Sequence, residues 1–119
     1  MLVAKDVMTK KVVTVGPTVK AKDAIAMLVK SKVSGMPVVD EKMKVVGMLT
    51  EADLLSARGS QTVASLMAKP AVTVAVSATL KSITDILLKK KIKRVAVVDK
   101  DKCLLGVVSR IDLLKAKLK

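Results

Sequence analysis

The chain has 119 residues, 51% of them apolar, and carries 23 Lys or Arg against 10 Asp or Glu, a formal net charge of +13. This length and composition predict a compact globular module with a buried core, and they exclude a disordered or collagen-like chain. The sequence has no His, Phe, Tyr, Trp or Asn and one cysteine, Cys103, which excludes His-based catalysis, His- or Cys-based metal sites, an internal disulfide and aromatic stacking on bases.

No apolar run reaches the roughly 18 residues that a membrane-spanning helix needs, and the first residues lack the long apolar stretch of a secretory signal. A single cysteine agrees with a reducing compartment. We therefore expect a cytoplasmic protein with no membrane partner.

The first half of the chain alternates β-branched runs with a helical pattern. Ala21, Ala24, Ile25 and Leu28 have the spacing of one helix face. Thr50 precedes a second helical segment, which its hydroxyl can cap. The elements predicted for this half are, in chain order, a short helix over 3–8, a strand over 12–15, a helix over 21–32, strands over 36–39 and 45–49, and a helix from residue 50.

The second half has the same order of patterns, with Ser109 in the capping position that Thr50 holds in the first half. The predicted elements are a short helix over 62–68, a strand over 71–76, a helix over 80–91, strands over 95–98 and 104–108, and a helix from residue 109. This order predicts an α/β (α+β) fold of two tandem βαββα repeats with pseudo-two-fold symmetry.

The two halves are an internal duplication. A shift of 59 residues superposes 7–55 on 66–114 without a gap, and 16 of these 49 pairs are identical. The polar segment 57–62 reads as a short connector. We therefore predict repeat 1 over 1–59 and repeat 2 over 60–119, fused into one compact module because a 60-residue repeat alone buries only about 60% of its unfolded surface.

The duplicated motif with the clearest chemical meaning is Gly-x-x-Thr/Ser-x-x-Asp, found at residues 47–53 and 106–112. A helix that begins at the Thr or Ser directs free N–H groups toward an anion. One turn later, the carboxylate of Asp53 or Asp112 can accept hydrogen bonds from ribose hydroxyls. The glycine permits a ligand to approach the backbone closely.

The alternative is that the motif is only structural. A Thr or Ser at the N-cap with Asp in the first turn stabilises any helix by about 1 kcal/mol. The sequence alone leaves both interpretations open.

The repeated pattern resembles a pair of CBS (cystathionine β-synthase) domains, also called a Bateman module, over nearly the whole chain. Besides the two motifs, residues 33–40 (Val-Ser-Gly-Met-Pro-Val-Val-Asp) and 6–9 (Asp-Val-Met-Thr) carry the resemblance. It implies a regulatory module without catalysis or a required cofactor. Its regulatory ligands would be adenosine compounds such as AMP, ADP, ATP or S-adenosylmethionine, bound in clefts between the repeats.

The resemblance also implies which residues line each cleft. In cleft 1, apolar residues and Ser34 would enclose the base, Ser109 and Asp112 would hold ribose and phosphate, and three basic residues would contact the phosphates. The residues expected in this cleft are Met8, Val13, Val33, Ser34, Met36, Lys93, Arg94, Val107, Ser109, Arg110 and Asp112.

In cleft 2 the resemblance places Thr50 and Asp53 at the ribose. Glu51 stands where repeat 2 has Arg110, so we expect cleft 1 to bind polyphosphates better. The residues expected in cleft 2 are Met67, Val72, Ile92, Val95, Met48, Thr50 and Asp53.

Two alternative functions remain open from the sequence. One is a structural scaffold with empty clefts, which forms a homodimer through the helices after Thr50 and Ser109; the restricted alphabet, with 20 Lys beside three Arg, is also typical of an engineered or reduced-alphabet sequence. The other is a polyanion-binding or nucleic-acid-binding protein, because the charge is +13, although no nucleic-acid-binding signature is present.

Overall fold

The structure is a computed structural model that describes residues 1–119, and it divides into two compact units. Unit 1 consists of Met1–Val12 and Val72–Lys119, and unit 2 of Val13–Ala71. The units therefore differ from the sequence repeats in one respect. Each unit contains the N-terminal segment of the other repeat.

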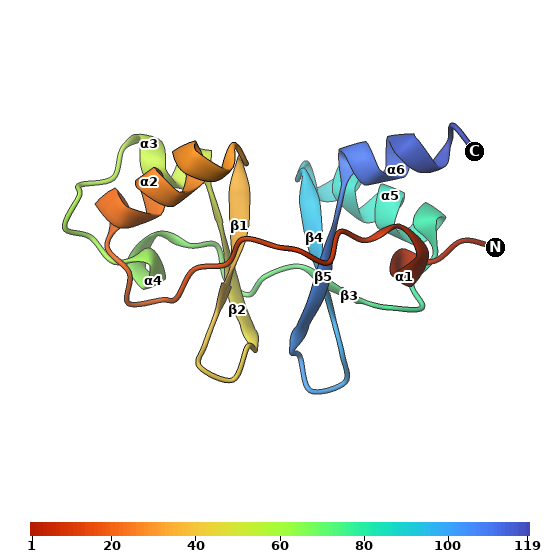
Figure 1. Ribbon diagram of the computed structural model, residues 1–119, viewed down its shortest axis with the longest axis horizontal. Coiled ribbons are helices and arrows are strands. Elements are labelled where there is room, and N and C mark those ends of the chain that lie inside the picture. Colours follow the sequence, from red (N-terminus) through yellow and green to blue (C-terminus); the bar gives the residue numbers. More distant parts are fainter. The chain divides into compact units, whose positions relative to one another are not determined.

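Unit 2 is an antiparallel hairpin with helices on one side of it (Figure 1). Strands β1 and β2 pair from Gly35 opposite Thr50 to Val39 opposite Val45, with a bulge between Val38 and Val39. The elements of this unit are α2 (Ala21–Ser31), β1 (Gly35–Val39), β2 (Val45–Thr50), α3 (Glu51–Leu55) and α4 (Val63–Leu66).

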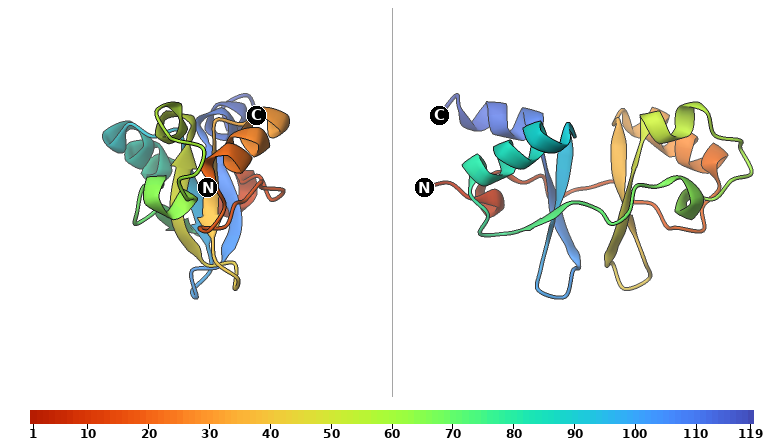
Figure 2. Two further views of the ribbon diagram at one scale, coloured as in Figure 1. Left: turned by 90° about the vertical axis from the view of Figure 1, so that its left-hand side faces the viewer. Right: turned by 180° about the vertical axis from the view of Figure 1, so that it is seen from behind.

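Unit 1 has the same plan with one more strand. Strand β3 runs parallel to β4, and β4 pairs antiparallel with β5. Helices α5 and α6 lie side by side over this sheet (Figures 1 and 2). The elements are α1 (Ala4–Val7), β3 (Thr73–Ala75), α5 (Leu80–Lys90), β4 (Arg94–Val98), β5 (Leu104–Ser109) and α6 (Arg110–Ala116).

The predicted fold class and the order of elements are confirmed, except for the strand over 12–15. There, only Val15 forms an isolated parallel bridge, to Val38. In unit 1, the N–H of Ala96 donates to Val72 O at 3.3 Å. The equivalent residue in unit 2 is Pro37, which has no N–H to donate, so the first strand of repeat 1 is reduced to one bridge.

The two cores repeat position by position. Eight buried residues of the unit 1 core lie 59 positions from eight of the unit 2 core, for example Leu28 and Leu87, both in the last turns of a long helix. The pairs are Ala4 and Val63, Val15 and Val74, Ala24 and Ile83, Leu28 and Leu87, Met36 and Val95, Val38 and Val97, Leu49 and Val108, and Leu54 and Leu113.

The leading helices α1 and α4 are exchanged between the repeats. Ala4 belongs to repeat 1 but is buried in the core of unit 1, and its N–H donates to Ala78 O at 2.8 Å. Val63 belongs to repeat 2 but is buried in unit 2, and its N–H donates to Val19 O at 2.8 Å. Each repeat is thus completed by a helix from the other. None of the helices is long and apolar enough to cross a bilayer.

Candidate functional site

The Gly-x-x-Ser-x-x-Asp motif of unit 1 lies where β5 ends and α6 begins. Asp112 Oδ2 accepts hydrogen bonds from Ser109 N at 2.9 Å and Ser109 Oγ at 3.1 Å. Ser109 Oγ in turn accepts from Asp112 N at 3.3 Å, which confirms Ser109 as the cap. The other carboxylate oxygen, Oδ1, accepts from Thr9 Oγ1 at 3.3 Å.

The motif of unit 2 has the same arrangement between β2 and α3. Asp53 Oδ2 accepts from Thr50 N at 2.9 Å and from Thr50 Oγ1 at 3.1 Å. Thr50 is the N-cap residue of α3 and forms a capping box with Asp53, which agrees with its predicted capping position. Both motif carboxylates are half-buried.

Both carboxylates therefore have a structural role as caps. The helices that they cap are short, five residues in α3 and seven in α6, so the local hydrogen bonds of the motif decide where each helix begins. A ligand that uses Asp112 would share the carboxylate with Ser109 and Thr9. The motif is thus pre-positioned by bonds that exist without any ligand.

The two motif glycines make room for the chain itself. A Cβ on Gly106 would lie 2.8 Å from Thr9 O and 2.9 Å from Met8 Sδ. A Cβ on Gly47 would collide with the side chain of Met67 and lie 3.0 Å from Ala68 O. The packing of the leading segments is therefore a structural reason for glycine at both positions, and the predicted role of these glycines in the approach of a ligand stays a prediction.

Thr9 is a residue of the motif's surroundings that sequence reasoning missed. Its N–H donates to Val107 O at 2.8 Å, and Val107 N donates to Thr9 O at 3.0 Å, which holds the Thr9 hydroxyl beside Asp112. The equivalent residue in unit 2 is Ala68, which pairs with Met48 through the same two backbone bonds but has no hydroxyl. A comparison of the two repeats next to the methionines would have identified this difference.

The predicted phosphate-binding residues of unit 1 lie together at one corner. Arg94 pairs with Ser109 in the β4–β5 ladder. Arg110 N donates to Lys93 O at 3.0 Å, and Arg110 Nε donates to Ile92 O at 3.1 Å. At the three equivalent positions of unit 2, Ser34, Gly35 and Glu51 replace three cations with a single anion, and Glu51 N donates to Ser34 O at 2.9 Å.

The apolar residues expected to contact the base differ in exposure. Met36 and Val95 are completely buried in the cores, and Val107 is 8% exposed. Val33 is exposed, whereas the other expected residues are half-buried: Met8, Val13, Met48, Met67, Val72 and Ile92. Unit 1 contains Met8, Val72, Ile92, Val95, Lys93, Arg94, Val107, Ser109, Arg110 and Asp112, and unit 2 contains Val13, Val33, Ser34, Met36, Met48, Thr50, Asp53 and Met67.

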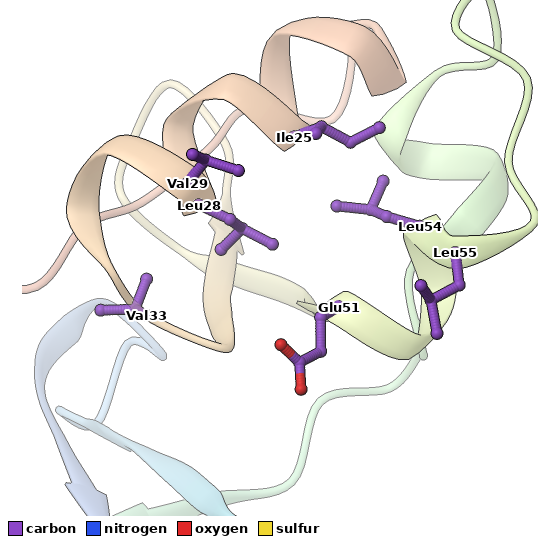
Figure 3. Close-up of a pocket in the computed structure, with 7 residues that line it drawn as sticks. All are labelled: Ile25, Leu28, Val29, Val33, Glu51, Leu54 and Leu55. Carbon is purple, nitrogen blue, oxygen red and sulfur yellow. The ribbon is translucent and has the colours of Figure 1, made fainter.

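A separate apolar groove of about 350 Å³ lies between α2 and α3 of unit 2 (Figure 3). Its lining has one charged side chain, Glu51, and exposed aliphatic residues such as Val29 and Leu55, which are 72% and 86% exposed. No group of three or more acidic or Cys side chains is placed to hold a metal ion. The groove is lined by Ile25, Leu28, Val29, Val33, Glu51, Leu54 and Leu55.

A family model described as "CBS domain" matches residues 4–60 and 63–119. Among curated proteins, the inosine-5'-monophosphate dehydrogenase of Aquifex aeolicus is 36% identical over 109 residues, which are 88% of this chain but 22% of that enzyme. The chloroplastic CBS domain-containing protein CBSX1 of Arabidopsis thaliana is 28% identical over 93% of this chain and 62% of its own length. The chain thus spans about a fifth of the dehydrogenase it matches and less than two thirds of CBSX1.

Two solved structures match almost the entire chain. The complex of CBSX2 with AMP has a TM-score of 0.93 at 30% identity and covers 99% of this chain and 97% of CBSX2. The CBS domain pair of protein MJ0100, in complex with 5'-methylthioadenosine and S-adenosyl-L-methionine, has a TM-score of 0.90 at 25% identity and covers 100% of this chain and 99% of its own.

Proposed function

Because the chain belongs to the CBS-domain family and contains two tandem copies of that domain, we propose that it is a non-catalytic regulatory module that binds adenosine-containing ligands. The observation that carries this proposal is the repeated pair of a hydroxyl and a carboxylate, Ser109 with Asp112 and Thr50 with Asp53, in each unit. The AMP complex of CBSX2 and the methylthioadenosine and S-adenosylmethionine complex of MJ0100 support the class of ligand.

In unit 1 the ribose hydroxyls donate to Asp112, whose carboxylate is held in place by Ser109 and Thr9. The phosphates of the same ligand meet Lys93, Arg94 and Arg110, which lie around the start of α6. Charge-assisted hydrogen bonds from Arg and Lys to phosphate are about twice as strong as neutral ones. Unit 1 should therefore prefer AMP, ADP or ATP to an uncharged adenosine compound.

In unit 2 the corresponding contacts have a different electrostatic character. Asp53 and Thr50 supply the same acceptor and donor, but Ser34, Gly35 and Glu51 stand where unit 1 has three cations. A phosphate near Glu51 would be repelled. Unit 2 should therefore prefer an adenosine ligand without phosphates, or the cationic S-adenosylmethionine.

Isothermal titration calorimetry with AMP, ATP and S-adenosylmethionine tests the proposal. We expect saturable heat for AMP and ATP that Asp112→Asn removes and Asp53→Asn leaves largely intact. Asparagine is preferred to alanine because Asp112→Ala also removes the acceptor of the Ser109 N–H in the capping box of α6 and would destabilise the start of that helix. If the wild-type protein melts cooperatively but gives no saturable heat with any of the three ligands, the proposal is contradicted.

A second candidate is a homodimer, because both units expose the same aliphatic positions on their paired helices. Val29 and Leu55 of unit 2 correspond to Leu88 and Leu114 of unit 1, which are 67% and 56% exposed. An aliphatic face repeated in both units suits contact with a second copy of the chain. The groove between α2 and α3 would accept its aliphatic side chains.

Sedimentation of the wild-type chain and of Leu55→Lys tests this second candidate. A concentration-dependent dimer that the substitution dissociates is expected. Ser56→Lys is the matched control, because it adds the same charge at the neighbouring exposed position without changing the aliphatic face. A monomer at all concentrations would exclude the dimer and leave nucleotide binding unaffected.

A further inference from the structure

The positive charge of the protein is concentrated in one unit. Unit 1 carries 15 Lys or Arg against five Asp, a net +10, whereas unit 2 carries eight against five Asp or Glu, a net +3. Much of the difference lies where α5 ends, β4 begins and α6 begins. We call this the basic corner, and it consists of Lys89, Lys90, Lys91, Lys93, Arg94 and Arg110.

The equivalent corner of unit 2 has the same local backbone structure with far fewer positive charges. The residues 59 positions earlier are Lys30, Ser31, Lys32, Ser34, Gly35 and Glu51, a net charge of +1 instead of +6. Both long helices end in the same way, with a left-handed C-cap at Lys32 (φ 57°) or Lys91 (φ 55°). Favourable interaction of cations with a helix C-terminus therefore accounts for two of the six charges, and four exceed what the helix requires.

The carboxylates of α5 and α6 that lie nearest to Lys89, Lys90 and Lys91 in the sequence have other partners. Asp85, in the middle of α5, is 4.0 Å from Lys81 on the preceding turn. Asp112, in the first turn of α6, accepts from Ser109 and Thr9. Lys89, Lys90 and Lys91 are exposed and form no ion pair, so their charges face solvent.

We infer that the basic corner binds the phosphate backbone of a nucleic-acid duplex, independently of base sequence. Closely spaced exposed cations replace the counterions condensed on a duplex, and the release of these counterions drives association. A duplex is favoured over a single strand because the chain has no aromatic residue on which unpaired bases can stack. This activity shares Lys93, Arg94 and Arg110 with the proposed phosphate contacts of the adenosine ligands. It differs from that binding because it needs the lysines of α5 and not Asp112.

The test is binding of a fluorescein-labelled 20-base-pair DNA duplex, measured by anisotropy between 50 and 200 mM NaCl. With about four to six phosphate contacts, the affinity should fall at least about 100-fold over this range. Lys89→Gln with Lys91→Gln should reduce the slope of log affinity against log salt by about two. A single strand of the same length should bind no more tightly than the duplex.

The matched control is Lys30→Gln with Lys32→Gln, which removes the same two charges from the same two positions of unit 2. It should leave the salt slope unchanged. Equal effects of the two double variants would contradict the assignment to the basic corner and indicate attraction by the net charge alone. No binding at 50 mM NaCl would overturn the inference.

A third variant separates this inference from nucleotide binding. Asp112→Asn should lose the calorimetric signal with AMP yet bind the duplex as tightly as the wild type or more so, because a negative charge is removed near the corner. Loss of duplex binding in Asp112→Asn, with an unchanged melting temperature, would show that the duplex occupies the adenosine site and would contradict a separate activity.

Discussion

The two units are built on the same eight core positions but differ in their edges and in their charge. Unit 1 has a third strand, a side-chain cap on its long helix, a hydroxyl beside the motif carboxylate and a net charge of +10. Unit 2 has an isolated bridge, a long helix with no side-chain cap, an alanine in place of that hydroxyl and a net charge of +3. The duplicated core is thus the same in both units, whereas the strand edges and the surface charge differ.

The largest effect should come from filling the space above a motif glycine. Gly106→Ala places a Cβ within 2.8 Å of the backbone oxygen of Thr9, and we expect a loss of about 2–3 kcal/mol in the free energy of unfolding by urea. Gly47→Ala should cost less, since its nearest neighbour is the flexible end of Met67. Gly16→Ala, which has only Val19 at 4.0 Å, should be neutral or slightly stabilising. An unchanged stability of Gly106→Ala would mean that the segment of Met8 and Thr9 does not pack on β5.

The strand difference can be tested by exchanging the residues responsible for it. Ala96→Pro removes the hydrogen bond to Val72 O and should cost about 1–2 kcal/mol, because a backbone carbonyl loses its partner. In Pro37→Ala, hydrogen exchange should detect a newly protected amide at residue 37 that donates to Val13. If that amide exchanged freely, the proline would not be the cause of the missing strand.

The helix caps should give an intermediate effect. Thr79 Oγ1 accepts from Ser82 N at 3.1 Å, whereas Lys20 at the same position of α2 makes no such bond. We expect Thr79→Ala to lose about 1 kcal/mol and Lys20→Thr to gain about 0.5–1 kcal/mol in thermal denaturation. Equal and negligible changes in both variants would indicate that water satisfies the helix ends equally well.

The smallest effect concerns repulsion within the basic corner. Lys89→Gln with Lys91→Gln should raise stability relative to Lys30→Gln with Lys32→Gln by about 0.2–0.5 kcal/mol at low salt. The comparison cancels the loss of the favourable helix-dipole interaction, which is common to both pairs. The difference should disappear at high salt because exposed charges are screened. A difference that persists at high salt would point to packing instead of charge.

Helical and strand periodicity was sufficient to predict the order of elements, and the 59-residue shift predicted two equivalent halves. Neither signal predicted the effect of Pro37. This residue has no N–H to donate to the carbonyl of Val13, which lies 24 positions earlier in the chain. The sequence pattern also did not predict that Ala4 packs in the core of the other repeat. An apolar residue is expected to be buried, but its type does not indicate in which core.

At the candidate site, the sequence predicted that Ser109 caps the last helix and that Asp112 lies in its first turn, because both positions follow from local helix geometry. Thr9 was missed because it lies 103 residues from Asp112 and reaches it only through the docking of the leading segment on β5. The same docking places Met8 and Thr9 against Gly106, a contact that the sequence pattern did not show. Local chemistry could be predicted, whereas contacts that depend on the exchange of segments could not.

The exchange of α1 and α4 makes neither repeat self-sufficient. A polypeptide with residues 1–59 alone would lack Val63 and leave an apolar hollow in its core, and one with residues 60–119 alone would lack Ala4. Mixed together, the two fragments can each donate the helix that the other needs, so they should fold as a complementing pair and not as separate proteins. Because the two repeats are fused in one chain, their association is intramolecular and does not depend on protein concentration.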